Sequence, residues 1–335
     1  MGQTTNPSSV QITPRDLQLF RKLNAAGWLT TRQIQRHFFP GVTANAVCKR
    51  LRKLVAGKYI GMARYNSTEC ALYRLAGQGK LALTEHFNLD AEGINIPTQV
   101  PRKLKHFIKI NDLRLSFEQL QRGSGASLLF FFSERELSLY RQHPGKASDA
   151  ILRLLEAYNI IPDTLARIRI AEQEVSRDID LAVEYDAGTE QAGYFGRTKV
   201  QQYARLFAKS QDWLEDFKVL TFTASVKRIV SLMEQVVYYQ APQHLFYFAP
   251  VEQLDQQGWE STELFLDPYD FFVPLRRGSQ IDVVEREIDG GTIPKYSLID
   301  LPAASPHRLS PRGEREGQKK AWNAAVYGEV DRPII

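Results

Sequence analysis

Apolar residues recur with a helical period near the start of the chain and predict three successive helices. The third, over residues 44–56, has the most regular pattern. Each predicted helix follows a threonine that can cap it and stops at a glycine or a Pro-Gly pair. The assigned caps are Thr13, Thr30 or Thr31, and Thr43; the assigned stops are Gly27, Phe39-Pro40-Gly41 and Gly57. The inward-facing positions are Leu17, Phe20, Leu23 and Trp28, then Ile34, His37 and Phe38, then Ala44, Val47, Leu51 and Leu54.

The next segment has the pattern of a β-hairpin. Residues 59–65 and 70–75 are predicted as its strands, residues 66–68 as its turn, and residues 77–86 as a closing helix. Three helices followed by a hairpin resemble a winged helix-turn-helix domain over residues 13–86. In such a domain the third helix enters the major groove of DNA, and the hairpin contacts the backbone or the minor groove.

Several residues of this segment carry groups that bind DNA. Asn45 and Lys49 lie on the polar side of the third helix and are expected nearest the bases. Phosphate contacts are expected from Arg50, Lys53 and Arg64. The full set of candidates is Thr43, Asn45, Lys49, Arg50 and Lys53 of the third helix and Arg64 of the hairpin. The alternatives stay open: each is also compatible with a solvated surface position, and winged helices also bind proteins.

Charge is unevenly distributed and supports the DNA interpretation. The net charge is +5, but residues 14–85 hold thirteen lysines or arginines and three acids, which makes that segment +10 and the remainder −5. A basic module joined to an acidic body favours double-stranded DNA as the partner. Cys48 and Cys70 lack metal-ligand spacing and fit a reducing compartment, and no apolar run is long enough to cross a bilayer. We therefore expect a cytoplasmic protein with no membrane association.

The remainder of the chain predicts an α/β domain. Residues 87–105 are interpreted as a basic linker, residues 106–250 as the domain, residues 251–304 as an unassigned extension, and residues 305–335 as a disordered tail. Periodicity predicts the order helix, three strands, helix, strand, helix, strand. The predicted helices cover residues 106–123, 191–209 and 226–237; the predicted strands cover residues 128–133, 161–170, 179–185, 218–223 and 245–248.

Acidic residues gather at the predicted strand ends of this domain. Asp163 starts one strand, and Glu184 and Asp186 end the next on a common face, because side chains of a strand repeat every two residues. Three carboxylates brought together would hold a hard cation such as Mg²⁺. The alternative is a group of solvated acids in turns.

The predicted α-βββ-α-β order resembles the restriction-endonuclease-like PD-(D/E)xK superfamily. Pro162-Asp163 matches the first half of its motif, and Glu184-Tyr185-Asp186 matches the second half except that Asp186 stands where the lysine is expected. The superfamily tolerates migration of that lysine to the following helix, where Lys199 is the first candidate and Gln202 the second. The resemblance implies that Asp163, Glu184, Asp186 and Lys199 are catalytic and that Asp163, Glu184 and Asp186 bind the metal.

A broader set of motifs is similar to the replication-relaxation family of bacterial plasmids and mobile elements. The set comprises the winged helix, His106 with Asn111 and Asp112, residues 133–136, Pro162-Asp163, and residues 183–190 followed by a helix with Lys199 and Tyr203. The resemblance implies DNA binding in replication, relaxation or mobilisation, with relaxase or replication partners.

Three functional hypotheses follow from these patterns. The first is a DNA-binding protein of a mobile element whose nuclease-like domain is inactive, with Asp186 at the lysine position in its favour. The second is a Mg²⁺-dependent DNA endonuclease that uses Asp163, Glu184 and Lys199. The third is a transcriptional regulator whose C-terminal domain serves for dimerisation or ligand binding. A homodimer is an open alternative, because winged-helix proteins often dimerise on palindromes. Family resemblance alone does not decide whether the chain is an enzyme.

Overall fold

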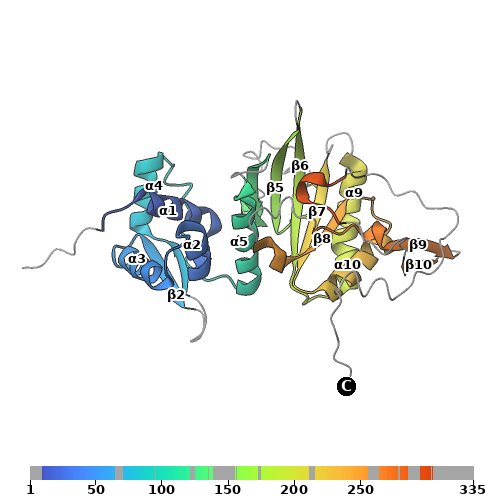
Figure 1. The fold of residues 1–335 in the computed structure, drawn as a ribbon, viewed down its shortest axis with the longest axis horizontal. Coiled ribbons are helices and arrows are strands. Elements are labelled where there is room, and N and C mark those ends of the chain that lie inside the picture. Colours follow the sequence, from blue (N-terminus) through green and yellow to red (C-terminus); the bar gives the residue numbers. More distant parts are fainter. Residues whose placement is uncertain are drawn as a thin grey trace, which may run out of the picture. The chain divides into compact units, whose positions relative to one another are not determined.

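Two compact units divide the chain in the computed structural model, Met1–Leu115 (unit 1) and Ser116–Ile335 (unit 2) (Figure 1). The predicted hairpin turn, Cys70 and the predicted tail lie outside the described residues. No helix in the described part of the chain has the length and apolar content that a membrane span requires. The structure describes residues 10–64, 71–94, 96–120, 125–134, 136–138, 155, 157–172, 175–210, 216–255, 264–277, 280–285, 295–302 and 304.

Unit 1 contains the predicted helices and both strands of the predicted hairpin. Each of the first three helices is capped by the hydroxyl of a threonine, Thr13, Thr30 or Thr43, which accepts a hydrogen bond from a backbone N–H in the first turn. Their apolar faces form the core of the unit. The elements are α1 (Pro14–Ala26), β1 (Trp28–Thr30), α2 (Thr31–Phe38), α3 (Ala44–Ala56), β2 (Ile60–Arg64), β3 (Ala71–Leu75) and α4 (Gly77–Phe87).

Strand β1 was not predicted. Gly27 ends α1 as predicted, with a φ of 77°. Trp28, which was expected to extend the apolar face beyond the helix, is instead the first residue of β1. Trp28 then pairs with Arg74 of β3, so that the sheet has the antiparallel order β1-β3-β2.

Helix α5 (Leu104–Phe117) shows that the boundary between the two units lies later in the chain than predicted. The amide of Asn111 donates to the Trp28 carbonyl at 2.7 Å, and the amide of Gln33 donates to Asp112 at 2.8 Å. These bonds and the packing of Leu104 on Trp28 make the helix as far as Leu115 part of unit 1. The sequence predicted a linker over residues 87–105 and a second domain from residue 106. That boundary is too early in the chain, because unit 1 extends to Leu115.

Unit 2 is built on a five-stranded mixed sheet of order β4-β5-β6-β7-β8. The first two strand pairs are antiparallel and the last two are parallel. Figure 1 shows α9 and α10 together beside this sheet, where they bury its main apolar core. The predicted α/β class is confirmed. The elements are β4 (Ala126–Ser133), β5 (Thr164–Glu172), β6 (Val175–Asp186), α8 (Ala192–Phe195), a π-helix (Gly196–Val200), α9 (Gln201–Ser210), β7 (Phe217–Thr223), α10 (Val226–Tyr238) and β8 (Phe246–Pro250).

The segment after residue 250 is an integral part of unit 2. Leu266 forms an antiparallel bridge with Phe248 of β8, and Arg177 of β6 donates to the Leu301 carbonyl at 2.6 Å. A domain ending at residue 250 is therefore too short. The additional elements are the strands β9 (Phe272–Arg277) and β10 (Gln280–Glu285) and the 3₁₀ helices η4 (Val251–Asp255), η6 (Pro268–Asp270) and η8 (Leu298–Asp300).

Candidate functional site

A cationic surface lies on α3 of unit 1. Val47, Leu51 and Leu54 turn inward and are fully buried, which leaves the opposite side of the helix in solvent. Of the candidates predicted from the sequence, Thr43, Asn45, Lys49 and Lys53 are all exposed on that helix or at its cap, and Arg64 is exposed on β2. The surface can therefore offer amide, hydroxyl and ammonium groups to a ligand.

Arg52 was missed by the sequence prediction and belongs to the same surface. It is exposed on α3, one residue before Lys53. Burial raises the pKa of Tyr73, and the positive charges of Arg52 and Arg64 both oppose that rise. Both guanidinium groups thus lie near enough to the Tyr73 phenol to act on its pKa. Helical spacing could have predicted this position, since Arg52 follows Lys49 by three residues and so lies near it on the helix.

Arg50 has a different environment from its neighbours on α3. Its guanidinium forms an ion pair with the buried Asp16 of α1 and donates to the Gln11 carbonyl at 2.8 Å. Burial alone would raise the pKa of Asp16, but hydrogen bonds from Arg50 and Thr13 outweigh burial and hold that pKa below its usual value. These contacts favour a role in packing α1 against α3 over the predicted phosphate contact.

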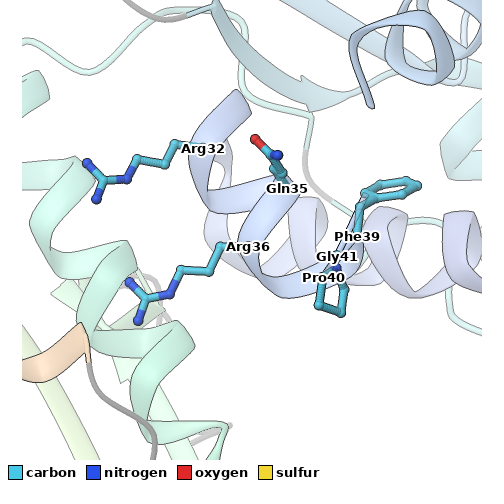
Figure 2. Close-up of a pocket in the computed structure, with 6 residues that line it drawn as sticks. All are labelled: Arg32, Gln35, Arg36, Phe39, Pro40 and Gly41. Atoms are coloured by element: carbon cyan, nitrogen blue, oxygen red, sulfur yellow. The ribbon is translucent and has the colours of Figure 1, made fainter. Parts of the chain in front are cut away.

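A pocket in unit 1 lies at the end of α2. Figure 2 shows Arg32 and Arg36 extending from one side of this helix, while Phe39 and Pro40 lie past its end. The polar groups do not point toward a common centre, so we assign no ligand to this pocket. Its lining consists of Arg32, Gln35, Arg36, Phe39, Pro40 and Gly41.

The acidic candidate site lies where β5 begins and β6 ends. The antiparallel register pairs Thr164 with Val183, so Asp163 and Glu184 follow as neighbours at the same edge. The backbone N–H of Tyr185 donates to the Asp163 carboxylate at 2.8 Å and ties the two strand ends together. Glu184 is buried, with 5% of its surface exposed. The sheet register thus brings together two of the predicted acids.

A helix covering this edge supplies the partners of Glu184. The Lys199 ammonium donates to Glu184 Oε1 at 2.9 Å, and the Tyr203 hydroxyl donates to the same oxygen at 2.6 Å. Lys199 also donates to the Ile161 carbonyl at 3.2 Å. Glu184 and Lys199, both candidates from the sequence, are thus in direct contact, and Tyr203, named above only as part of the family motif, is an additional partner.

Lys199 lies within the π-helix that precedes α9. Gly196 begins this turn under the ring of Tyr239, and a Cβ at Gly196 would lie 2.4 Å from that ring. Only a glycine allows the helix to approach α10 this closely. Lys199 and Tyr203 are four residues apart and both reach Glu184, as expected for neighbours on one helix face. Single π-turns occur often at functional sites.

The charged groups of this site change one another's pKa. Burial raises the pKa of Glu184, Lys199 opposes this rise, and the nearby Asp163 adds to it. Burial would lower the pKa of Lys199, but Glu184, Asp163 and Glu134 outweigh burial and raise it. Lys199 therefore keeps its positive charge beside the Glu184 carboxyl, and Asp163 and Glu134 lie near enough to favour that charge. Glu134 was not predicted as part of this site, although it belongs to the motif over residues 133–136.

Asp186 does not join the other two acids as predicted. Its carboxylate forms an ion pair with Arg228 of α10 and accepts the Gly188 N–H at 2.9 Å. Among the described residues, no group of three His, Cys, Asp or Glu side chains is arranged to hold a metal ion. The predicted set of three metal ligands therefore does not form. Asp163 and Glu184 remain adjacent oxygen donors, and Mg²⁺ commonly takes only one or two carboxylates together with water and phosphate oxygens.

Comparison with known protein families gives a match that covers both candidate sites. A family model described as replication-relaxation matches residues 20–220, which is more than half of the chain. The matched span includes α3, the ends of β5 and β6, and the helix that carries Lys199 and Tyr203. No curated protein and no solved structure matches the chain.

Proposed function

This chain belongs to the replication-relaxation family, and from that premise we propose that it is a DNA-binding protein that acts in the replication or relaxation of a plasmid or mobile element. The observation that carries the proposal is the exposed positive area formed by Lys49, Arg52 and Lys53 of α3 with Arg64 of β2. The proposed ligand is double-stranded DNA, bound by unit 1 in the manner of a winged helix.

The distribution of groups on α3 suits this role. Lysine and arginine neutralise phosphates, and each contact releases counterions from the DNA. Asn45 and Thr43 lie at the start of the helix and are exposed, so their side chains are available to base edges. Arg50 is excluded from the main contacts because Asp16 already holds its guanidinium.

The proposal is tested by the salt dependence of binding to a mixed-sequence duplex, followed by fluorescence anisotropy. We expect Lys49→Ala with Lys53→Ala to weaken binding and to reduce the slope of log K against log salt by about 2, because each lost phosphate contact removes about 1. Arg169→Gln is the control, since it removes one positive charge from the exposed surface of unit 2. Equal slopes in all three proteins would exclude α3 as the DNA contact.

A second candidate function is supported by the acidic site in unit 2. We propose Mg²⁺-dependent DNA cleavage there, because Asp163, Glu184 and Lys199 come from three separate segments and meet at one edge of the sheet. The order of β4, β5, β6, α9 and β7 along the chain also supports this proposal. Asp163 and Glu184 would hold the metal, which when bound polarises a phosphate and activates water.

The roles of the chain's own residues follow from their contacts. Lys199 supplies positive charge that can be offered to the phosphate, provided that its ammonium leaves Glu184 Oε1. The Tyr185 N–H fixes the Asp163 carboxylate at the strand end. We assign Asp186 no role in cleavage, because its carboxylate forms an ion pair with Arg228.

A plasmid assay tests this second candidate. Supercoiled DNA is incubated with the full chain and Mg²⁺ or Mn²⁺, beside Glu184→Gln and the matched control Glu190→Gln, which alters an exposed acid beyond the end of β6. Nicked or linear DNA produced by wild type and Glu190→Gln, but lost in Glu184→Gln, is the expected result. Intact plasmid with wild type on substrates that it binds would contradict the nuclease proposal and leave DNA binding in place.

A further inference from the structure

Tyr203 is a deeply buried polar side chain that touches the acidic site. It is fully buried, and its ring packs against Phe217 and Phe246 with centroid distances of 6.1 Å in each case. Its hydroxyl donates to Glu184 Oε1 at 2.6 Å. The ring is thus fixed by the core, and it presents one O–H group at a defined point.

The two donors on Glu184 Oε1 differ in mobility. Lys199 has 30% of its side-chain surface exposed and a flexible stem, whereas Tyr203 has no exposed surface. A ligand that attracts or replaces the ammonium can therefore change the Lys199 contact. The Tyr203 contact has no such freedom, and it keeps Oε1 directed into the protein.

We propose that Tyr203 is a positioning residue that orients the Glu184 carboxylate toward a divalent cation. This inference rests on the proposed nuclease function, because it assigns to Glu184 the role of metal ligand. Hydrogen bonds to a ligating carboxylate fix its orientation, and their loss usually weakens metal binding by about 10- to 100-fold. Tyr203 would act through Glu184 and not on the metal itself, since its hydroxyl donates to Glu184 Oε1.

The structure offers a matched control for the hydroxyl group. Tyr247 of β8 is also fully buried, and its hydroxyl has no hydrogen-bond partner among the described residues. Tyr203→Phe and Tyr247→Phe each remove one buried oxygen and keep the ring. Only the first removes a contact with Glu184, so a difference between them reports that contact.

The experiment is a titration of the full chain with Mn²⁺ alone, read as the metal-induced rise in melting temperature. A ligand that binds only the folded state raises that temperature with concentration, which gives an apparent Kd. We expect Tyr203→Phe to weaken the apparent Mn²⁺ affinity by about 10-fold or more, and Tyr247→Phe to leave it unchanged. In a Glu184→Gln background, adding Tyr203→Phe should cause no further loss of affinity.

Each result has a separate meaning. Equal Mn²⁺ affinity in wild type, Tyr203→Phe and Tyr247→Phe would overturn the positioning role while keeping the metal site. No metal-induced shift in wild type would overturn both the metal site and this inference. A lower melting temperature of Tyr203→Phe without metal, at unchanged Mn²⁺ affinity, would show a structural contact only and would also overturn the inference.

Discussion

Unit 1 and unit 2 present their charged groups in opposite ways. On α3 the cations Lys49, Arg52 and Lys53 stand in solvent. In unit 2 the cation Lys199 lies between carboxylates, and Glu184 beneath it is 5% exposed. The first arrangement can exchange its counterions for phosphates at little cost, whereas a ligand of the second must first displace an internal partner.

Burial, not the type of side chain, therefore separates the two regions. Arg50 illustrates this within unit 1, because it belongs to α3 but is paired with Asp16, which is 1% exposed. A set of basic residues on one helix thus contains both ligand-facing and structural members. Substitutions should distinguish them, since the structural members affect folding and the exposed members affect binding.

The largest effect on stability is expected at the buried ion pair of unit 1. Asp16→Ala leaves the Arg50 guanidinium without its carboxylate and removes the capping contact with Thr13. We predict a loss of about 3 kcal/mol in the free energy of unfolding of unit 1, as for other broken buried pairs. Urea denaturation measures this loss. The control is Lys53→Ala, an exposed change on α3, whose free energy of unfolding should stay within about 0.5 kcal/mol of wild type. Equal losses in Asp16→Ala and Lys53→Ala would refute the distinction between structural and ligand-facing charges.

The next effect concerns α5 and the extent of unit 1. Asn111 is 3% exposed and donates to the Trp28 carbonyl at 2.7 Å. Asn111→Ala leaves that buried carbonyl without its donor, so we predict a loss of about 2 kcal/mol. Thermal unfolding of the full chain measures it, with the exposed Asn45→Ala as the control. Equal stability of Asn111→Ala and Asn45→Ala would mean that the Asn111 hydrogen bond does not hold α5 on unit 1.

The sequence was sufficient for those parts of the fold that depend on local pattern. Helix α3 has the predicted bounds, because its threonine cap and apolar spacing lie within thirteen consecutive residues. The closeness of Asp163 and Glu184 also follows from pattern, since strands β5 and β6 are consecutive and antiparallel. Both cases need only the order of neighbouring elements.

The remaining features depend on packing between distant residues. Asp186 is neutralised by Arg228, which lies 42 positions later on α10, and no local pattern signals that contact. The pairing of Arg50 with Asp16 spans 34 positions and likewise requires the packing of α1 on α3. Tyr203 could have been found, because it follows Lys199 by one helical turn and so shares its face.

The pH dependence of stability should differ in sign between the two regions. Burial raises the pKa of Glu184 above 4.5, so the folded state binds that proton more tightly than the unfolded state. The contribution of Glu184 to stability therefore falls as the pH rises above 4.5, by at most about 1.4 kcal/mol per pH unit. The pKa of Asp16 is lowered from 3.8, so its contribution is instead lost as the pH falls below that value.

Glu184→Gln removes the titration in unit 2 and keeps the size of the side chain. Relative to wild type, this variant should gain stability as the pH is raised above 4.5. Denaturant unfolding of both proteins at a series of pH values measures the difference. A difference that is constant with pH would show that Glu184 titrates alike in the folded and unfolded chain.

The smallest expected effects are those of two arginine substitutions in unit 2. They test whether burial determines how much free energy of unfolding is lost when one charge of an ion pair is removed. Two arginines of β5 each form a two-point contact with the aspartate directly opposite on β6, Arg167 with Asp180 and Arg169 with Asp178. The first pair is 26% and 13% exposed, and the second is 48% and 36% exposed. We predict that Arg167→Gln costs about 1 kcal/mol, because it leaves a mostly buried carboxylate, and that Arg169→Gln causes no measurable change. Arg167 also lies over the Phe130 ring, 5.2 Å from its centroid, which belongs to its more buried environment. Urea denaturation compares the two variants on one sheet, and equal losses would mean that pairing itself, and not the buried environment, determines the cost.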